Sequence, residues 1–245
     1  MAPPLDWPTL LSALGITTLA ALVQGTLGFG FSIVSVPILV LLDPGLAPSP
    51  QILMVVPLTL WMALRERGAI VWNELGWILV GRVPGVTGGA ILLAAAPKPV
   101  LDVVLALLVG GAAAVLGTGA QVPRTALTRL TAGFFSGLSG VVSSIGGPPV
   151  ALLYRGAKGS ELRGTLAALF LIGVVMTIAG RWTAGALVSR DLVLALWLSP
   201  GLVLGLSLSK PLLPWIEGPK LARGVLVLAA LASTLLALRA IAAFR

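Results

Sequence analysis

The apolar run from Leu10 to Leu42 is the feature that most restricts how this chain can fold. A continuous helix of roughly 33 residues would be about 50 Å long, whereas the hydrocarbon core of a bilayer is about 30 Å thick. The run therefore cannot be one upright span, and the segment Gln24–Gly30, which contains three glycines, marks where it breaks. Backbone amides that a break leaves unpaired inside a bilayer are tolerated only beside a cavity or other protein. The break is therefore a candidate binding site.

The composition is typical of an all-α polytopic membrane protein. Of 245 residues, 58% are hydrophobic and only 10% are charged, and the mean hydropathy is +1.07. The absence of cysteine and histidine excludes disulfides, thiolate nucleophiles and Ser-His-Asp catalysis, and we expect no metal, no cofactor and no enzymatic activity. The net charge is +8, and the basic residues are scattered along short loops. This pattern is typical of residues that orient a protein in a membrane, and it does not favour a nucleic-acid partner.

Ten apolar runs are separated by connections too short to form a soluble domain. We expect a helix or part of a helix in each run. The runs cover residues 9–24, 29–42, 50–64, 75–94, 100–117, 127–141, 147–154, 163–180, 192–208 and 222–238.

The chain also repeats itself, since three blocks recur in the same order at nearly constant offsets. The matching pairs are Gly25 and Gly137, Gly28 and Gly140, Ser32 and Ser144, and Pro37 and Pro149 (offset 137 − 25 = 112), Gly68 and Gly185 (117), and Pro84 and Pro200 (116). We therefore predict two homologous halves, about 1–118 and 119–245.

The distribution of Lys and Arg predicts how the halves are oriented. If each glycine-broken run crossed the membrane once, the two sides would carry eight and seven basic residues, which is no bias. If each is instead a hairpin or a pair of short helices that returns to its starting side, the counts become ten and five, as the positive-inside rule requires. The halves are then inverted, their broken helices meet near the midplane, and both termini face outward, an architecture that recurs in transporters.

The two glycine-rich breaks have the chemistry of an anion site. A broken helix presents unpaired N–H groups and the positive end of its dipole. Serine and glutamine side chains add neutral donors, which suit an ion that must also leave. The alternative is that small residues merely let helices pack closely. That alternative is the stronger one for any single glycine or serine, whereas the two motifs together favour binding.

Two arginines are further candidate anion ligands. Arg82 is the only cation well inside a predicted span, and Arg163 begins another. A buried arginine in a membrane is costly and usually faces a cavity or a partner, although Arg82 could instead extend to the interface. We expect the remaining basic residues to be loop charges at the headgroups. All eight acids fall near run ends, so no carboxylate is placed to relay protons. The membrane potential alone would favour export of a monoanion, by about 2.3 kcal/mol per 100 mV.

The paired motifs resemble those of the TauE/SafE sulfite exporter family of membrane permeases. The resemblance rests on Gln24–Gly30 with Val36–Ile38, and on Ser136–Gly140 with Gly146–Val150, where Gly-Gly-Pro-Pro is the more diagnostic part. It implies transport of sulfite, sulfonates or related small oxyanions, usually outward.

The sequence thus predicts a multi-pass secondary transporter of the cell (inner) membrane. It would export a small sulfur-containing oxyanion, sulfite or an organosulfonate, by alternating access. The alternatives are an anion channel, a permease for small carboxylates, a metal-ion transporter and an integral-membrane enzyme. We expect the lipid bilayer and the small anionic substrate as partners, and a homodimer from base rates. The predicted substrate-binding residues are Gln24, Gly25, Gly28, Phe29, Gly30, Ser32, Arg82, Ser136, Gly137, Ser139, Gly140, Ser143, Ser144, Gly146, Gly147, Pro148 and Arg163.

Overall fold

The glycine-rich segment of the first apolar run ends one helix and begins another. The computed structural model describes residues 4–117, 122–154, 157, 159–216, 227 and 234. Helix α1 (Trp7–Leu27) ends at Gly28, whose φ is 90°, and α2 (Phe31–Leu42) begins after Gly30, whose φ is 118°. A side chain at either position would clash with the neighbouring backbone, so the left-handed conformation favours glycine there. The predicted break is therefore made by these two residues.

The second motif breaks in the same manner. Helix α6 (Ala126–Ser143) begins at a capping box formed by Thr125 and ends at Ser144, which has a φ of 61°. After Ile145 and Gly146, the short helix α7 (Gly147–Ala151) follows. The half-helix expected after this break is thus only five residues long.

The other elements are also helical, and the described residues contain no strand. Five helical stretches are long and apolar enough to cross a membrane, so the chain is a polytopic helical membrane protein. The predicted run at 222–238 lies outside the described residues, apart from 227 and 234. The remaining elements are η1 (Pro44–Leu46), α3 (Ser49–Arg65), η2 (Arg67–Ala69), η3 (Trp72–Glu74), α4 (Leu75–Ala95), α5 (Lys98–Gly117), α8 (Gly159–Thr183) and α9 (Ser189–Ile216).

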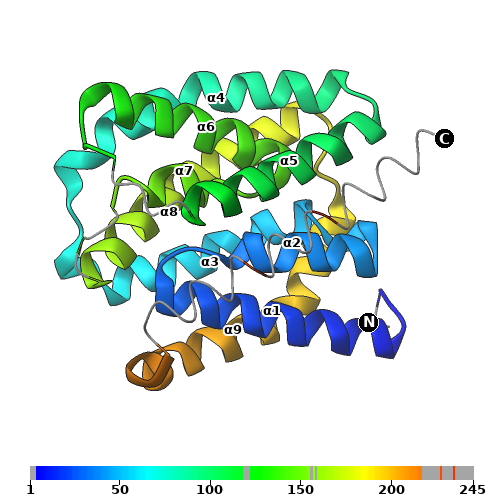
Figure 1. Ribbon diagram of the computed structural model, residues 1–245. Coiled ribbons are helices and arrows are strands. Elements are labelled where there is room, and N and C mark those ends of the chain that lie inside the picture. Colours follow the sequence, from blue (N-terminus) through cyan, green and yellow to red (C-terminus); the bar gives the residue numbers. More distant parts are fainter. Residues whose placement is uncertain are drawn as a thin grey trace.

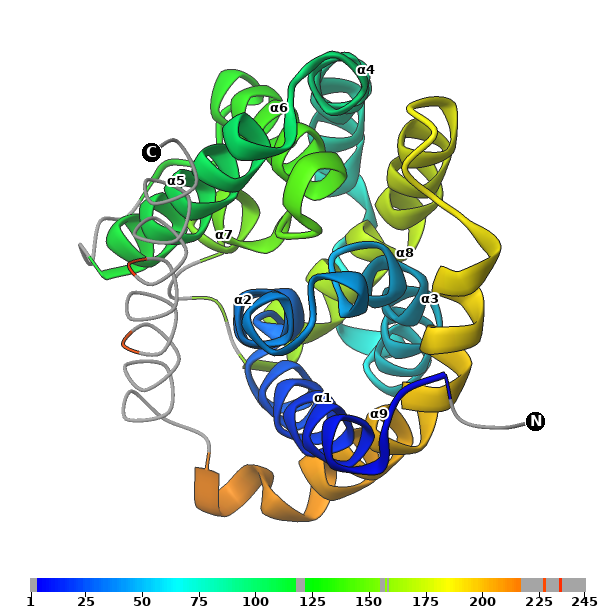
Figure 2. The same cartoon turned by 90° about the vertical axis from the view of Figure 1, so that its right-hand side faces the viewer.

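Close backbone contacts join α4 to α6 and α1 to α9, and Figure 1 shows each pair running side by side. A Cβ added to Gly85 of α4 would lie 2.1 Å from the carbonyl oxygen of Phe134 in α6. One added to Gly205 of α9 would lie 2.3 Å from the carbonyl oxygen of Thr18 in α1. Such approaches are typical of membrane helices that pack through small residues. Helices α3 and α8 pack against each other between the two pairs (Figure 2).

One end of the bundle gathers buried and half-buried basic residues, and we call it the basic end. Arg65 at the end of α3 donates to the carbonyl of Gly25 near the end of α1. Arg163 near the start of α8 pairs with Glu66 at 3.0 Å. Arg124, just before α6, contacts Glu74 at 3.3 Å and Glu161 at 3.3 Å. Burial lowers the pKa of Arg124, but these carboxylates outweigh it, so its pKa is raised. The starts of α4, α6 and α8 therefore meet the ends of α1 and α3.

The chain reverses direction at both breaks. Gly45, just after α2, lies beside Arg190 at the start of α9. The start of α9 and the end of α1 lie at opposite ends of the bundle. The pair α1–α2 therefore leaves and returns to the end where α9 starts (Figure 1). The guanidinium of Arg124 donates to the carbonyl of Leu153 at 2.8 Å, so α6–α7 leaves and returns to the basic end. The two hairpins thus enter the bundle from opposite ends.

One expectation about the loops is wrong. Arg181 was expected in a connecting loop as a headgroup charge, but α8 continues to Thr183 and the Arg181 side chain is buried. Its guanidinium donates to backbone carbonyls at the end of α6. The sequence did not indicate this because the apolar run ends at Gly180, whereas the helix extends one turn farther.

Candidate functional site

A cavity of about 40 Å³ lies between the two breaks. A bound water occupies on the order of 10–15 Å³ by the same measure, so there is room for a small ion. Its polar wall comes from both motifs and from α4. The side chains or backbones of Gln24, Phe29, Gly30, Ser32, Arg82, Gly140, Ser144, Gly146 and Gly147 form this wall.

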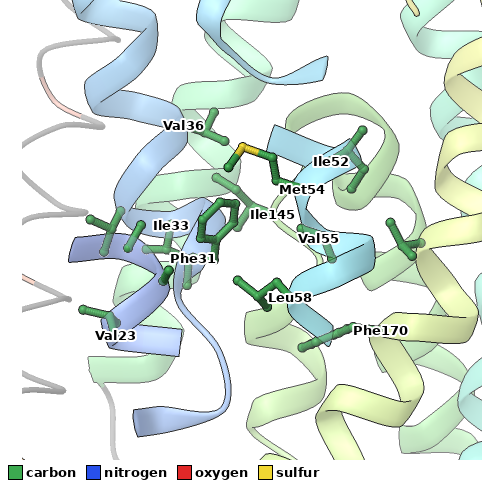
Figure 3. Close-up of a cluster of buried hydrophobic side chains, with 14 of the residues drawn as sticks. Val23, Phe31, Ile33, Val36, Ile52, Met54, Val55, Leu58, Ile145 and Phe170 are labelled. Atoms are coloured by element: carbon green, nitrogen blue, oxygen red, sulfur yellow. The ribbon is translucent and has the colours of Figure 1, made fainter. Parts of the chain in front are cut away.

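The rest of the wall is apolar and comes mainly from α3 and α8. Ile52 and Val55 of α3 and Phe170 of α8 line the cavity, together with Ile33 and Ile145. Figure 3 shows these side chains converging with Phe31 and Leu58 in one cluster. An apolar surround lowers the local dielectric and strengthens any charge interaction inside it. A cavity of this kind suits one small charged group.

Arg82 is the charged residue of the cavity, and its side chain is only 3% exposed. Its two terminal nitrogens donate to hydroxyls, at 2.7 Å to Oγ of Ser136 and at 2.9 Å to Oγ1 of Thr177. Its Nε is buried and has no hydrogen-bond partner in the described part of the chain. The ion pairs found among the described residues do not include Arg82. A buried cation without a countercharge is costly, so this site is complementary to an anion.

Small residues of α6 and α8 make room for the Arg82 side chain. A Cβ on Gly173 would lie 2.6 Å from Nε of Arg82, and one on Gly140 would lie 3.2 Å from a terminal nitrogen. The hydroxyl of Ser136 accepts from Arg82 and donates to the carbonyl of Gly146 at 2.6 Å. Ser136 therefore connects the arginine to the break between α6 and α7.

Replacing Ser136 by alanine should destabilise the protein by about 1–3 kcal/mol, because two buried polar partners lose their hydrogen bonds. The control is Ser139→Ala on the same helix, since the Ser139 hydroxyl donates only to the carbonyl of Phe135 one turn away. Thermal unfolding in lipid nanodiscs measures both variants. Equal midpoints for the two would contradict the bridging role of Ser136.

Gln24 occupies one of the backbone N–H donors that the first break was expected to leave free for an anion. Its Oε1 accepts from the backbone N–H of Phe31 at 2.9 Å, across the interruption between α1 and α2. This donor of the α2 N-terminus is therefore already satisfied and is not left free for a ligand. The positive end of the α2 dipole still points at the cavity, because Gly30 and Ser32 line it.

Other predicted residues lie beside the cavity wall rather than on it. Gly25 faces Ser209 of α9, and Gly137 faces the Arg82 backbone, so both serve helix packing. Gly28 lies against the backbone of Arg163. Arg163 itself pairs with Glu66 at 3.0 Å and donates to the carbonyl of Thr26 at 3.4 Å. The structure therefore places Arg163 at the basic end of the bundle.

Three more predicted residues of the second motif point elsewhere. Ser139 and Pro148 line a second, largely apolar cavity of about 350 Å³ between α5, α6 and α7. The hydroxyl of Ser143 donates to the carbonyl of Ser139 within α6. Thr177 was missed by the sequence analysis, although a buried threonine in an apolar helix is a recognisable signal. The described residues contain no group of three His, Cys, Asp or Glu side chains that could hold a metal ion.

Comparison with known proteins gives one family. A family model described as sulfite exporter TauE/SafE matches residues 13–236. No curated protein and no solved structure matches the chain. The match includes both breaks, Arg82 and all the lining residues of the cavity.

Proposed function

Because the chain belongs to the sulfite exporter TauE/SafE family, we propose that it carries a small sulfur-containing oxyanion across the cell (inner) membrane and binds it beside Arg82. The family is one of membrane transporters, not of enzymes. The observation that carries the proposal is Arg82 itself, which is buried in a cavity between the two breaks and whose hydrogen-bond partners among the described residues are two hydroxyls. Sulfite and sulfonates supply the missing negative charge.

The geometry of Arg82 suits a tetrahedral or pyramidal oxyanion. A guanidinium presents donors in a rigid fork, and two of them can bind two oxygens of one anion. Each terminal nitrogen of Arg82 carries a second N–H beyond the one donated to Ser136 or Thr177, and these can bind such an anion. Ser32 and Ser144 line the same cavity and can donate to a third oxygen. A single fixed charge with neutral donors holds a monoanion without making its release too slow.

Alternating access between inverted halves would move the anion past this site. The hairpins α1–α2 and α6–α7 enter the bundle from opposite ends, as two inverted repeats would. The helix pairs support the same relation, because α4 of the first half packs on α6 of the second and α9 packs on α1. The basic end would face the cytoplasm by the positive-inside rule. Outward movement of a monoanion then follows the membrane potential.

Purified protein should show a rise of several degrees in its thermal unfolding midpoint with sulfite or methanesulfonate, because a ligand that binds only the folded state stabilises it. Sulfate should stabilise less than methanesulfonate, or than sulfite in mildly acidic buffer where it is mainly the hydrogensulfite monoanion, since a dianion leaves one charge uncompensated in the cavity. Proteoliposomes loaded with unlabelled sulfite should then accumulate labelled sulfite by counterflow. A larger shift with acetate would favour a carboxylate permease, and flux that neither saturates nor shows counterflow would favour a channel.

A further inference from the structure

Arg65 joins the first hairpin to a helix of the other half. It is the last residue of α3. One terminal nitrogen donates to the carbonyl of Gly25 at 2.6 Å, and the other donates to the hydroxyl of Ser209 at 3.0 Å. Gly25 lies two residues before the end of α1, and Ser209 lies in α9. One guanidinium therefore ties the end of α1 to α9 at the basic end.

Arg181 does the same at the opposite end. It lies two residues before the end of α8 and is only 3% exposed. One terminal nitrogen donates to the carbonyl of Val141, and the other donates to the hydroxyl of Ser49 at 2.8 Å. Val141 lies two residues before the end of α6, and Ser49 begins α3. This guanidinium therefore ties the end of α6 to α3.

The two arginines correspond to each other within the repeat. Their separation (181 − 65 = 116) equals that of Pro84 and Pro200, one of the matching pairs that define the halves. Each donates to the third-last carbonyl of the broken helix in its own half. Each also takes its serine partner from the opposite half. Two such contacts at opposite ends of the bundle are a matched pair rather than two separate surface interactions.

The chemistry explains why arginine occupies both positions. The last carbonyls of a helix have no partner within the helix, and a cation there also offsets the negative end of the dipole. A guanidinium has enough donors to hold a carbonyl and a serine at once, which an ammonium does less well. The contact stays intact only while the hairpin and the helix of the other half remain together. Separating the halves at one end must therefore release the arginine at that end.

We infer that Arg65 and Arg181 are the two gate residues of the transporter, each holding closed the access route at its own end of the bundle. The inference rests on the proposed alternating access and adds the side chains that control it. Arg65 closes the basic end and Arg181 closes the opposite end. They act as positioning residues, because neither lines the cavity.

The chain contains no cysteine, so a single introduced thiol reports on access to the cavity. Ser32→Cys places that thiol on the cavity wall. A membrane-impermeant thiol reagent is applied to sealed vesicles of each orientation, and Gly68→Cys, at an exposed position within η2, identifies the basic face. In the Ser32→Cys background, Arg65→Gln should speed labelling from the basic face about tenfold, and Arg181→Gln should do so from the opposite face.

Two exposed arginines provide matched controls. Arg67→Gln removes the same charge at the basic end, and Arg190→Gln removes it at the opposite end. Neither control should change the labelling rate by more than about twofold, because loss of an exposed charge has little energetic effect. Ser209→Ala and Ser49→Ala keep each arginine and its carbonyl contact but remove its serine partner, and they should reproduce the two patterns at smaller size. They also remove the hydrogen bonds from these hydroxyls to the carbonyls of Leu206 and Ala186. They replace the arginine variants if those do not fold.

The inference is overturned if labelling is unchanged, if both variants open the same face, or if the exposed controls act equally. Its failure is separable from failure of the proposed function. If sulfite stabilises the protein but labelling is not side-specific, the anion site is supported and the gate inference fails. If sulfite does not stabilise the protein but labelling is side-specific as expected, the gate inference is supported and the proposed substrate is wrong.

Discussion

Replacing Arg82 by glutamine should lower sulfite counterflow about a hundredfold, because removal of a buried charged partner typically weakens binding by 2–5 kcal/mol. The side chain supplies the cavity's positive charge, and glutamine retains a donor without that charge. Arg82→Lys keeps the charge but loses the fork and the paired contacts to Ser136 and Thr177. We therefore expect it to retain an intermediate flux.

The same variant should not be less stable when no anion is bound. A buried cation paired only with hydroxyls is expensive to hold, and replacing such a group by a neutral one is often neutral or stabilising. The thermal midpoint of Arg82→Gln without ligand should thus equal or exceed that of the unsubstituted protein. The sulfite-induced shift, in contrast, should disappear. Loss of ligand response without loss of stability is the signature of a binding residue rather than a structural one.

Arg129→Gln is the matched control for this experiment. Arg129 lies on α6, is partly buried and pairs with Glu74 at 3.4 Å, outside the cavity. Its loss should leave counterflow within about twofold of normal. Unchanged flux in Arg82→Gln, or an equal loss in Arg129→Gln, would show that the anion does not bind at the proposed position.

The positions of the breaks could be predicted because they depend on local backbone conformation. The three glycines of Gln24–Gly30 lie in a run too long for one span, and two of them adopt the left-handed conformations that end α1 and begin α2. Arg82 stood out because one charge in an otherwise apolar stretch needs a partner. Each of these signals can be read from a short stretch of the sequence, without knowing which helices are in contact.

The parts that could not be predicted depend on contacts between distant helices. Ser136 and Ser139 look alike in the sequence, yet one binds Arg82 and the other lines the second cavity. The small residues that pack α6 against α4 and those that line the cavity are of the same types. Ile52 and Phe170 look like ordinary core residues, and only the packing of α3 and α8 brings them to the site. Arg65 and Arg181 were taken for loop charges because each lies at a run end.

Gly85→Ala should be among the most disruptive single-methyl changes in α4. The added Cβ would lie 2.1 Å from the Phe134 carbonyl oxygen and 2.8 Å from its carbon, so the two backbones must separate. Overpacking of this kind costs about 1–3 kcal/mol, and contact with an unyielding backbone places this variant at the upper limit. We expect a lower thermal midpoint and a loss of counterflow together.

Flux should fall because the α4–α6 contact also positions Arg82. A Cβ on Gly133 would lie 3.1 Å from the Arg82 backbone nitrogen, and one on Gly137 would lie 2.6 Å from its carbonyl oxygen. The backbone of Arg82 is therefore held directly against α6, which carries Ser136. Moving α4 away lengthens the contact between Arg82 and Ser136 and displaces the guanidinium from the cavity.

Gly88→Ala tests whether proximity, rather than loss of a glycine, is the cause. Gly88 is three residues away on the same helix, and nothing lies within 4 Å of a Cβ added there. Alanine should be neutral or stabilise the helix by up to about 1 kcal/mol, since glycine is the poorer helix former. If Gly85→Ala proved as harmless as Gly88→Ala, α4 and α6 would not be in backbone contact. Arg82 would then lack the support that aims it between the two breaks, and the anion site would have to be placed elsewhere.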